Sequence, residues 1–277
     1  MSLNNFIPTV WSARLLERLK VAHVFANVVN TDYAGEISAY GDSVKINTIG
    51  DVTVSDYTKN TNIGDPEALD AVQTILQIDQ AKYFNFQVDD IDQAQQKPKV
   101  MDAAMQEAGF ALADTVDGFI ADFHDQAHEE VEENNLLTNH DDVYEVIAEA
   151  GQKLDEENVP RDGRWMVVPP FMNTAMVIAG IMDTAGSIDA NQINQNGYVG
   201  RLLGFDIYMS NNLKGDGTWT YGMAGTRKAI SYAEQILDME AYRPEKRFAD
   251  AVKGLHVYGA KVVYPKALVR LKVRPDS

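Results

Sequence analysis

The sequence contains no cysteine, which excludes disulfide bridges, thiolate metal sites and cysteine nucleophiles together. This absence fits a protein that is made and kept in a reducing cytosol. The opening MSLNNFIPTVW lacks a basic segment followed by an apolar run, so we expect no secretory signal. The longest apolar stretch, residues 171–182, is shorter than the roughly 20 residues that span a bilayer. We therefore expect a soluble, unexported protein without a membrane partner.

Basic residues are scarce in the middle of the chain. Residues 61–160 contain 4 basic and 24 acidic side chains, whereas residues 161–277 contain 15 basic and 11 acidic ones. The net charge of the whole chain is −17. Affinity for nucleic acids depends mainly on Lys and Arg, which displace counterions from phosphates. If the protein lies near DNA, we expect it to do so without binding it specifically.

The motifs that would indicate catalysis are also missing. No G-x-S-x-G segment occurs, and Gly41-Asp42-Ser43 precedes an alternating segment, as a turn that opens a strand would. Gly215-Asp216-Gly217 has no third glycine at phosphate-loop spacing, and we interpret it as the tip of a hairpin between 205–210 and 218–221. Carboxylates are too numerous for any pair to stand out as an acid–base dyad. We expect a protein that is not an enzyme and has no cofactor.

His124 and His128 are the residues that come nearest to a metal motif. Two histidines four apart on a helix can bind one zinc ion, and acidic residues follow them at 129–133. In zinc peptidases of this pattern Glu follows the first histidine, but here Asp125 does. The alternative, which we favour, places both histidines on the solvated end of an acidic helix. A zinc hydrolase thus remains a distant alternative.

Several segments look unable to bury their apolar side alone. In residues 10–30 apolar side chains recur at near-helical spacing with charged side chains between them, as in an arm that packs on another surface. Residues 44–54 and 84–88 have strand-like alternation, and the Asn-, Asp- and Pro-containing stretch 57–69 lies between them. The simplest interpretation is a two-stranded ribbon with a polar tip. Such a ribbon is marginally stable by itself, so we expect a neighbouring chain to complete it.

The rest of the chain predicts an α+β fold. An apolar stripe from Met101 to Phe123 predicts a helix over about 99–128, and a second helix is expected over 141–158. A buried strand at 165–168, an apolar helix at 171–182 and a surface loop at 183–200 follow. Strands are expected at 205–210, 218–221, 229–233, 237–242, 254–263 and 268–273. The segment 242–247 between two of them reads as a hairpin tip.

Three blocks of this sequence resemble the coat proteins of tailed double-stranded-DNA phages. The opening FIPTVWSARLLERLKVAHVFANVVNTDYAGEISAYGDSVKI has the family's progression from Phe-Ile-Pro to Gly-Asp-Ser-Val-Lys-Ile. DVYEVIAEAGQKLDEENVPRDGRWMVVPP is similar to its helix, Val-Pro-x-x-Gly-Arg-Trp turn and buried strand, and GYVGRLLGFDIYMSNNL and AISYAEQI resemble its next blocks. The similarity runs in register from Phe6 to about Val263.

The resemblance implies a Hong Kong 97-type capsid fold. Its parts would be an N-terminal arm (1–40), an extended β-hairpin loop with flanking strands (41–97), the spine helix of the peripheral domain (98–140), an axial domain (141–228) and a β-rich return to the peripheral domain (229–277). The protein would be a major capsid subunit, made in the host cytoplasm and located in the virion. It would assemble into pentamers and hexamers of an icosahedral shell around DNA, with a scaffolding protein and a portal as further partners. An encapsulin-like bacterial nanocompartment is the nearer alternative.

We also name residues expected at the subunit interfaces. They come from the arm, the extended loop and the hairpin tip: Trp11, Leu15, Tyr57, Asp65, Glu67, Arg243, Lys246 and Arg247. The tip carries three cations in a chain dominated by acids, and it could reach the acidic extended loop of a neighbour. A plain solvated turn is the competing interpretation of the tip.

Overall fold

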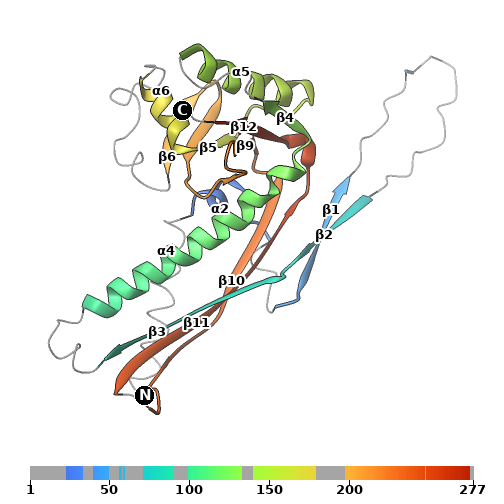
Figure 1. Ribbon diagram of the computed structural model, residues 1–277. Helices are drawn as coiled ribbons and strands as arrows, with labels where there is room; N and C mark the ends of the chain where they lie inside the picture. Colours follow the sequence, from blue (N-terminus) through green and yellow to red (C-terminus); the bar gives the residue numbers. More distant parts are fainter. Residues whose placement is uncertain are drawn as a thin grey trace.

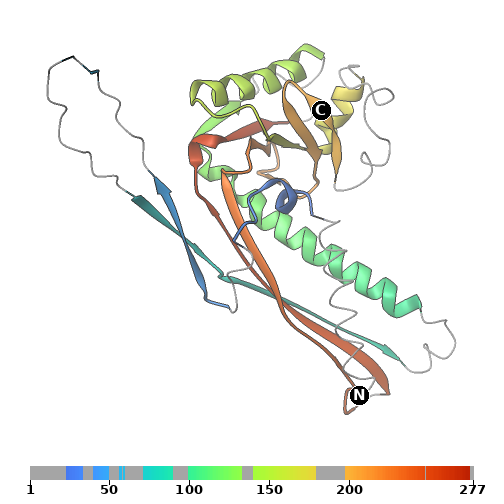
Figure 2. The same cartoon turned by 180° about the vertical axis from the view of Figure 1, so that it is seen from behind.

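The computed structural model describes residues 23–33, 40–49, 56, 57, 59, 71–89, 99–132, 140–178, 197–246 and 248–274. These residues form a compact body built on a mixed seven-stranded sheet, from which a long helix and a long three-stranded sheet extend side by side (Figure 1). A two-stranded ribbon leaves the long sheet on the side away from that helix (Figure 2). The expected α+β class is therefore confirmed.

The compact body has its strands in the order β4-β12-β9-β5-β7-β6, with β8 paired to β9. All five residues of β5 are buried, which explains why WMVV is a continuous apolar run instead of an alternating one. Helices α5 (His140–Glu156) and α6 (Pro170–Ile178) contribute apolar residues to the same core. The strands are β4 (Glu129–Glu132), β5 (Arg164–Val168), β6 (Tyr198–Leu202), β7 (Phe205–Met209), β8 (Lys214–Gly215), β9 (Thr220–Thr226) and β12 (Leu268–Val273).

The long helix α4 (Lys99–Ala121) joins two cores. Its N-terminal and middle turns pack Met105 and Leu112 against Val252 and the phenylalanines of the long sheet. Its second half places Val116 and Ile120 in the core of the compact body, which also contains the short helix α2 (Phe25–Val28). The apolar stripe predicted from the sequence is thus split between two partners.

The predicted end of this helix at about His128 is wrong. α4 ends at Ala121 and continues as a 3-10 turn, η3 (Asp122–Gln126). The tighter turn leads the chain into β4, which pairs in parallel with β12. It also buries His124 against Tyr221 of β9, with 4.5 Å between the ring centroids. Tertiary pairing at this point overrides the helical periodicity.

The long sheet consists of β3 (Gln80–Asp89), β10 (Ile230–Tyr242) and β11 (Ala249–Val262) in the antiparallel order β10-β11-β3. β10 merges two predicted strands, with a register shift between Ile236 and Asp238. The turn between β10 and β11 confirms the predicted hairpin tip. Gly215-Asp216-Gly217 is also a turn, but it joins β8 to β9 instead of joining 205–210 to 218–221.

The predicted ribbon has the wrong partner strand. β1 (Ser43–Ile49) pairs with β2 (Ala71–Gln77), whereas β3, which contains the predicted strand 84–88, pairs with β11. Phe84 and Phe86 pack with the residues that lie under α4, so their alternation reflects a core position and not a free ribbon. Residues 52–54 and most of 57–69 lie outside the described residues.

The base of the ribbon is fixed to the long sheet. Val44, Ile46, Leu76 and Ile78 form a small core with Ala233 and Val257, on the face opposite α4. The backbone of Gly41 and Asp42 also exchanges hydrogen bonds with Ile78 at 3.0 Å each. The ribbon therefore leaves the body in a defined direction.

Gly259 of β11 permits this close docking. A Cβ atom added there would lie 2.1 Å from the carbonyl oxygen of Gln77, which belongs to the backbone and cannot swing away. We expect Gly259→Ala to destabilise the fold by about 1–3 kcal/mol and to displace the ribbon base. Urea unfolding measures the loss, and Gly118→Ala on α4 is the control because nothing lies within 4 Å of its added Cβ. Equal stability of the two variants would contradict the assigned role.

Candidate functional site

The ribbon offers unpaired edges at the periphery of the molecule. Within the described residues β1 and β2 pair only with each other, so each has an outer edge without a strand. Ile75 points outward and is 47% exposed, and Tyr57 beyond the strands is 73% exposed. Backbone groups on such edges are templates for another chain. Tyr57, predicted at an interface, is thus placed where a neighbour could contact it.

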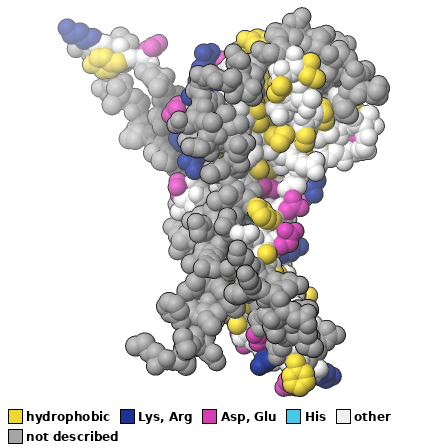
Figure 3. Space-filling view, turned by 90° about the vertical axis from the view of Figure 1, so that its left-hand side faces the viewer, with side chains coloured by type: hydrophobic (Ala, Val, Ile, Leu, Met, Phe, Trp, Pro, Cys, Tyr) yellow, Lys and Arg dark blue, Asp and Glu magenta, His cyan; other side chains and the backbone are white. Residues whose placement is uncertain are grey.

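The hairpin tip is the second protruding feature. Arg243 and Lys246 are exposed, as predicted, and Arg243 Nε lies 3.7 Å from Asp250 of the same hairpin. Phe248 follows them with 84% of its side chain exposed, a residue that the sequence reasoning missed although a phenylalanine in a charged turn is a signal. Figure 3 shows cationic and apolar side chains together at the lower end of the molecule, where this hairpin turns.

The tip and the ribbon lie at opposite ends of the molecule (Figures 1 and 2). The structure therefore does not bring Arg243 and Lys246 near Tyr57 within one chain. The other predicted interface residues, Trp11, Leu15, Asp65, Glu67 and Arg247, lie outside the described residues, and their roles stay predictions.

The structure does not place His124 and His128 as the zinc alternative requires. His124 lies in the 3-10 turn η3, stacked on Tyr221, and burial lowers its pKa. His128 lies beyond that turn, just before β4, and its Nε2 faces Glu157 at 3.6 Å. The two histidines therefore do not share one face of an α-helix, which was the premise of the predicted pair.

His128 does meet two carboxylates, those of Glu129 and Glu157. Each of these is already paired with a lysine: Lys153 lies 3.2 Å from Glu129 Oε2, and Lys266 lies 3.1 Å from Glu157 Oε2. The pair formed with Glu129 also raises the pKa of Lys153. This network reads as ion pairing that ties α5 to β4 and to the turn before β12.

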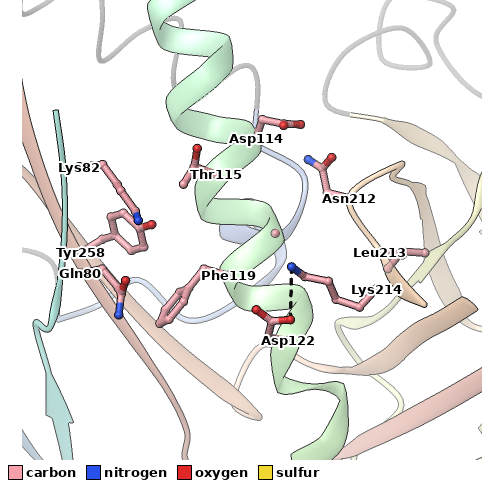
Figure 4. Close-up of a pocket in the computed structure, with 11 residues that line it drawn as sticks. Gln80, Lys82, Asp114, Thr115, Phe119, Asp122, Asn212, Leu213, Lys214 and Tyr258 are labelled. Atoms are coloured by element: carbon pink, nitrogen blue, oxygen red, sulfur yellow. Dashed lines mark ion pairs between the residues drawn. The ribbon is translucent and has the colours of Figure 1, made fainter. Parts of the chain in front are cut away.

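A polar groove of about 540 Å³ lies between α4, β3, β11 and the segment before β8 (Figure 4). Two lysines and two aspartates line it, and Lys214 Nζ lies 3.3 Å from Asp122. Thr115 lines it, but the Thr115 hydroxyl donates a hydrogen bond to the Ala111 carbonyl of its own helix. The residues that line the groove include no histidine. They show no nucleophile–base pair.

Comparison with known proteins identifies the family. The family model of phage capsid proteins matches residues 71–271. The chain belongs to the phage capsid protein family. Its role is that of a major capsid subunit, and the tailed-phage resemblance drawn from the sequence is confirmed. Among the described helices, none is both long and apolar enough to cross a membrane.

Solved structures confirm the Hong Kong 97-type fold of this capsid protein. A structure from Mycobacterium phage Che8 is 33% identical with a TM-score of 0.70, and the alignment covers 91% of each chain. The capsid of cyanophage P-SCSP1u is 17% identical with a TM-score of 0.66, covering 93% of this chain and 88% of the other. No curated protein sequence matches.

The encapsulin-like alternative has less support. A virus-like particle from Pyrococcus furiosus shares the fold with a TM-score of 0.57, over 94% of this chain and 96% of the other. Its identity is only 13%, so it shows the fold alone. The family match and the higher identity to a phage structure favour a virion capsid protein over a nanocompartment shell protein.

Proposed function

We propose that this capsid protein assembles into pentamers and hexamers through its arm, its extended loop and its hairpin tip. The observation that carries the proposal is the ribbon, whose two strands pair with no other described strand. A two-stranded sheet of this kind is marginal in water and gains stability when a neighbour covers its edges. Symmetric repetition multiplies each weak contact over the shell. The proposed role is structural and not enzymatic.

The five segments of the fold are assigned as part of this proposal. They are the arm (1–40), the extended loop (41–97), the spine helix (98–140), the axial domain (141–228) and the return to the peripheral domain (229–277). The packing of α4 against the long sheet supports one peripheral unit. Three strand pairings cross the proposed limits: β3 pairs with β11, β4 with β12, and β9 with β12.

The remaining partners follow from the capsid role and from charge. A scaffolding protein and a portal are proposed to take part in assembly in the host cytoplasm. The −20 carried by residues 61–160 supports a wall that repels DNA weakly and encloses it without specific binding. A packaged duplex could then slide along the wall during filling.

Between neighbours, we propose that the tip cations Arg243, Lys246 and Arg247 contact the acidic loop with Asp65 and Glu67. The described part of the ribbon lies at the opposite end of the molecule from the hairpin tip (Figure 1), which supports a contact between copies over one within a single chain. Exposed ion pairs contribute about 0–1 kcal/mol each, and salt screens them over about 8 Å. The contact would therefore set the rate and salt dependence of assembly more than the stability of a subunit.

Replacing Arg243, Lys246 and Arg247 together by alanine should slow assembly and make it less dependent on salt. Light scattering across a salt titration measures the rate, and the melting temperature of the unassembled subunit should not fall. The matched control replaces three exposed cations of the compact body, Arg201, Arg227 and Lys228, and so changes the net charge equally. If both variants assemble equally slowly, or if the tip variant assembles at the unchanged rate, the tip is a solvated turn and not an assembly contact.

A further inference from the structure

Residues 23–30 connect the chain's first 22 residues to the body, and distant side chains hold them. The four-residue helix α2 has no side-chain cap of its own. Asp117 of α4 supplies one, because its carboxylate accepts hydrogen bonds from the backbone N–H of Val24 at 2.8 Å and of Phe25 at 3.0 Å. Asn30 then exchanges backbone hydrogen bonds with Ile230 and Tyr232 of β10.

His23 lies at the centre of this attachment and is 1% exposed. Its Nδ1 is 3.7 Å from Asp117 Oδ1, and its Nε2 is 3.5 Å from Glu234 Oε2. Among the described residues, neither nitrogen has a hydrogen-bond partner. A neutral imidazole would therefore bury two unsatisfied polar atoms, whereas an imidazolium is attracted by both carboxylates. The geometry favours the charged ring.

Several other polar groups surround His23. Glu234 Oε2 accepts a hydrogen bond from the Tyr232 hydroxyl at 2.6 Å and lies 3.0 Å from His256 Nε2. His256 is buried and lies against the ring of Tyr258. The titratable groups facing the cluster are thus Asp117 from α4, Tyr232 and Glu234 from β10, and His256 and Tyr258 from β11. Of the two histidines beside Glu234, His23 is the one whose ring lies between the carboxylates of Asp117 and Glu234.

We propose that His23 is a proton-dependent latch: its imidazolium, held between Asp117 and Glu234, fastens residues 23–30 to α4 and β10, and loss of its proton releases them. The segment upstream of His23 includes the arm residues expected at subunit interfaces. Protonation of a single buried histidine would then control how stably residues 23–30 are attached to the body.

The direction of the pH effect follows from the charges. Burial alone would lower the pKa of His23, but Asp117 and Glu234 raise it from 6.5 to about 9. A pKa raised in the folded state means that the stabilisation is complete below 6.5 and is lost as the pH rises through about 9. Burial opposes ionisation of Glu234, but the two histidines lower its pKa, so its contribution is lost only in acid. The latch is closed at neutral pH and opens on the alkaline side.

Hydrogen exchange of the full-length chain, in the form in which it purifies, tests the latch. The amides of Val24, Phe25 and Asn30 should lose protection between pH 6.5 and 10, with a roughly 100-fold rise in local opening after correction for intrinsic exchange. The buried strand β5 is the internal control and should keep its protection. Equal changes in β5 and in residues 23–30, or no change in either, would overturn the proposal without any variant.

Two variants sharpen the test. His23→Gln removes the titrating group, so its residues 23–30 should open readily already at pH 7 and show no further pH dependence. His128→Gln, at a half-exposed histidine outside the cluster, should behave like the unchanged chain. A wild-type pH profile in His23→Gln would assign the alkaline release to another group. If that variant does not fold, the pH dependence of hydrogen exchange in the unchanged chain still tests the proposal.

Discussion

Deleting residues 57–69 should abolish shell formation while leaving a folded subunit. The deletion removes the far part of the extended loop but keeps the paired segments 43–49 and 71–77, whose apolar residues dock on the long sheet. A shell needs the same contact at every equivalent interface, so its loss should affect assembly far more than folding. Sedimentation velocity should show capsomer-sized or smaller species where the full chain gives shells.

The control for this deletion replaces residues 57–69 by thirteen Gly and Ser residues. It keeps the length of the loop but removes Tyr57, Asp65 and Glu67. If this variant also fails to assemble, the side chains of the loop make the contact between subunits. If it assembles, the length of the loop is sufficient for assembly. Closed shells from the deletion variant would show that this loop is not required between neighbours.

Arg164→Met should destabilise the compact body by about 3–5 kcal/mol, because it removes a buried hub of hydrogen bonds. The Arg164 guanidinium donates to the carbonyls of Gly151, Pro160 and Val159 and to Asp155 at 2.7 Å. Its guanidinium lies near the C-terminal end of α5, where the helix dipole favours a cation.

The local chain explains why Arg164 is placed there. α5 ends at Glu156, and Asn158 just after it lies in the left-handed region at φ 57°. The Val159 N–H then donates to the Leu154 carbonyl at 2.9 Å. This turn brings the carbonyls of Val159 and Pro160 toward Arg164. Methionine has a similar reach but no donor, so the buried Val159 carbonyl would lose its charged partner.

Arg161→Ala is the matched control for Arg164→Met. Both arginines pair with Asp155 and together they lower its pKa, but the side chain of Arg161 is 80% exposed and that of Arg164 only 4%. The exposed pair should contribute about 0–1 kcal/mol. Urea unfolding of both variants measures the difference. Equal losses would mean that Asp155, and not the backbone carbonyls, accounts for the stabilisation by Arg164.

Local patterns predicted those elements whose partners lie close in sequence or whose apolar period is strong. The strand 165–168, the helix at 141–158, the tip at 242–247 and the start of α4 are found where the sequence placed them, within a few residues. The pairing of strands was harder to predict than their positions. The segment AVQTILQ, the true partner of β1, was missed because Ile75 faces solvent and weakens the apolar–polar alternation of that segment.

The polar cluster around His23 could not be predicted from spacing. His23, Asp117, Glu234 and His256 are far apart in the chain and meet only through the packing of α4 on the long sheet. One local signal was present, since VAHVFANVV and LHVY each enclose a lone histidine in an apolar run. A buried histidine needs partners, but the sequence does not say which carboxylates supply them.

Electron microscopy of the purified full-length chain tests the central claim most directly. A capsid subunit of this fold should form closed shells of uniform size, or pentameric and hexameric rings where shells do not close. The sample should be imaged over a range of protein and salt concentrations, with circular dichroism to show that the chain is folded. Folded monomers alone at every concentration would contradict the assignment of this chain as a self-assembling shell subunit.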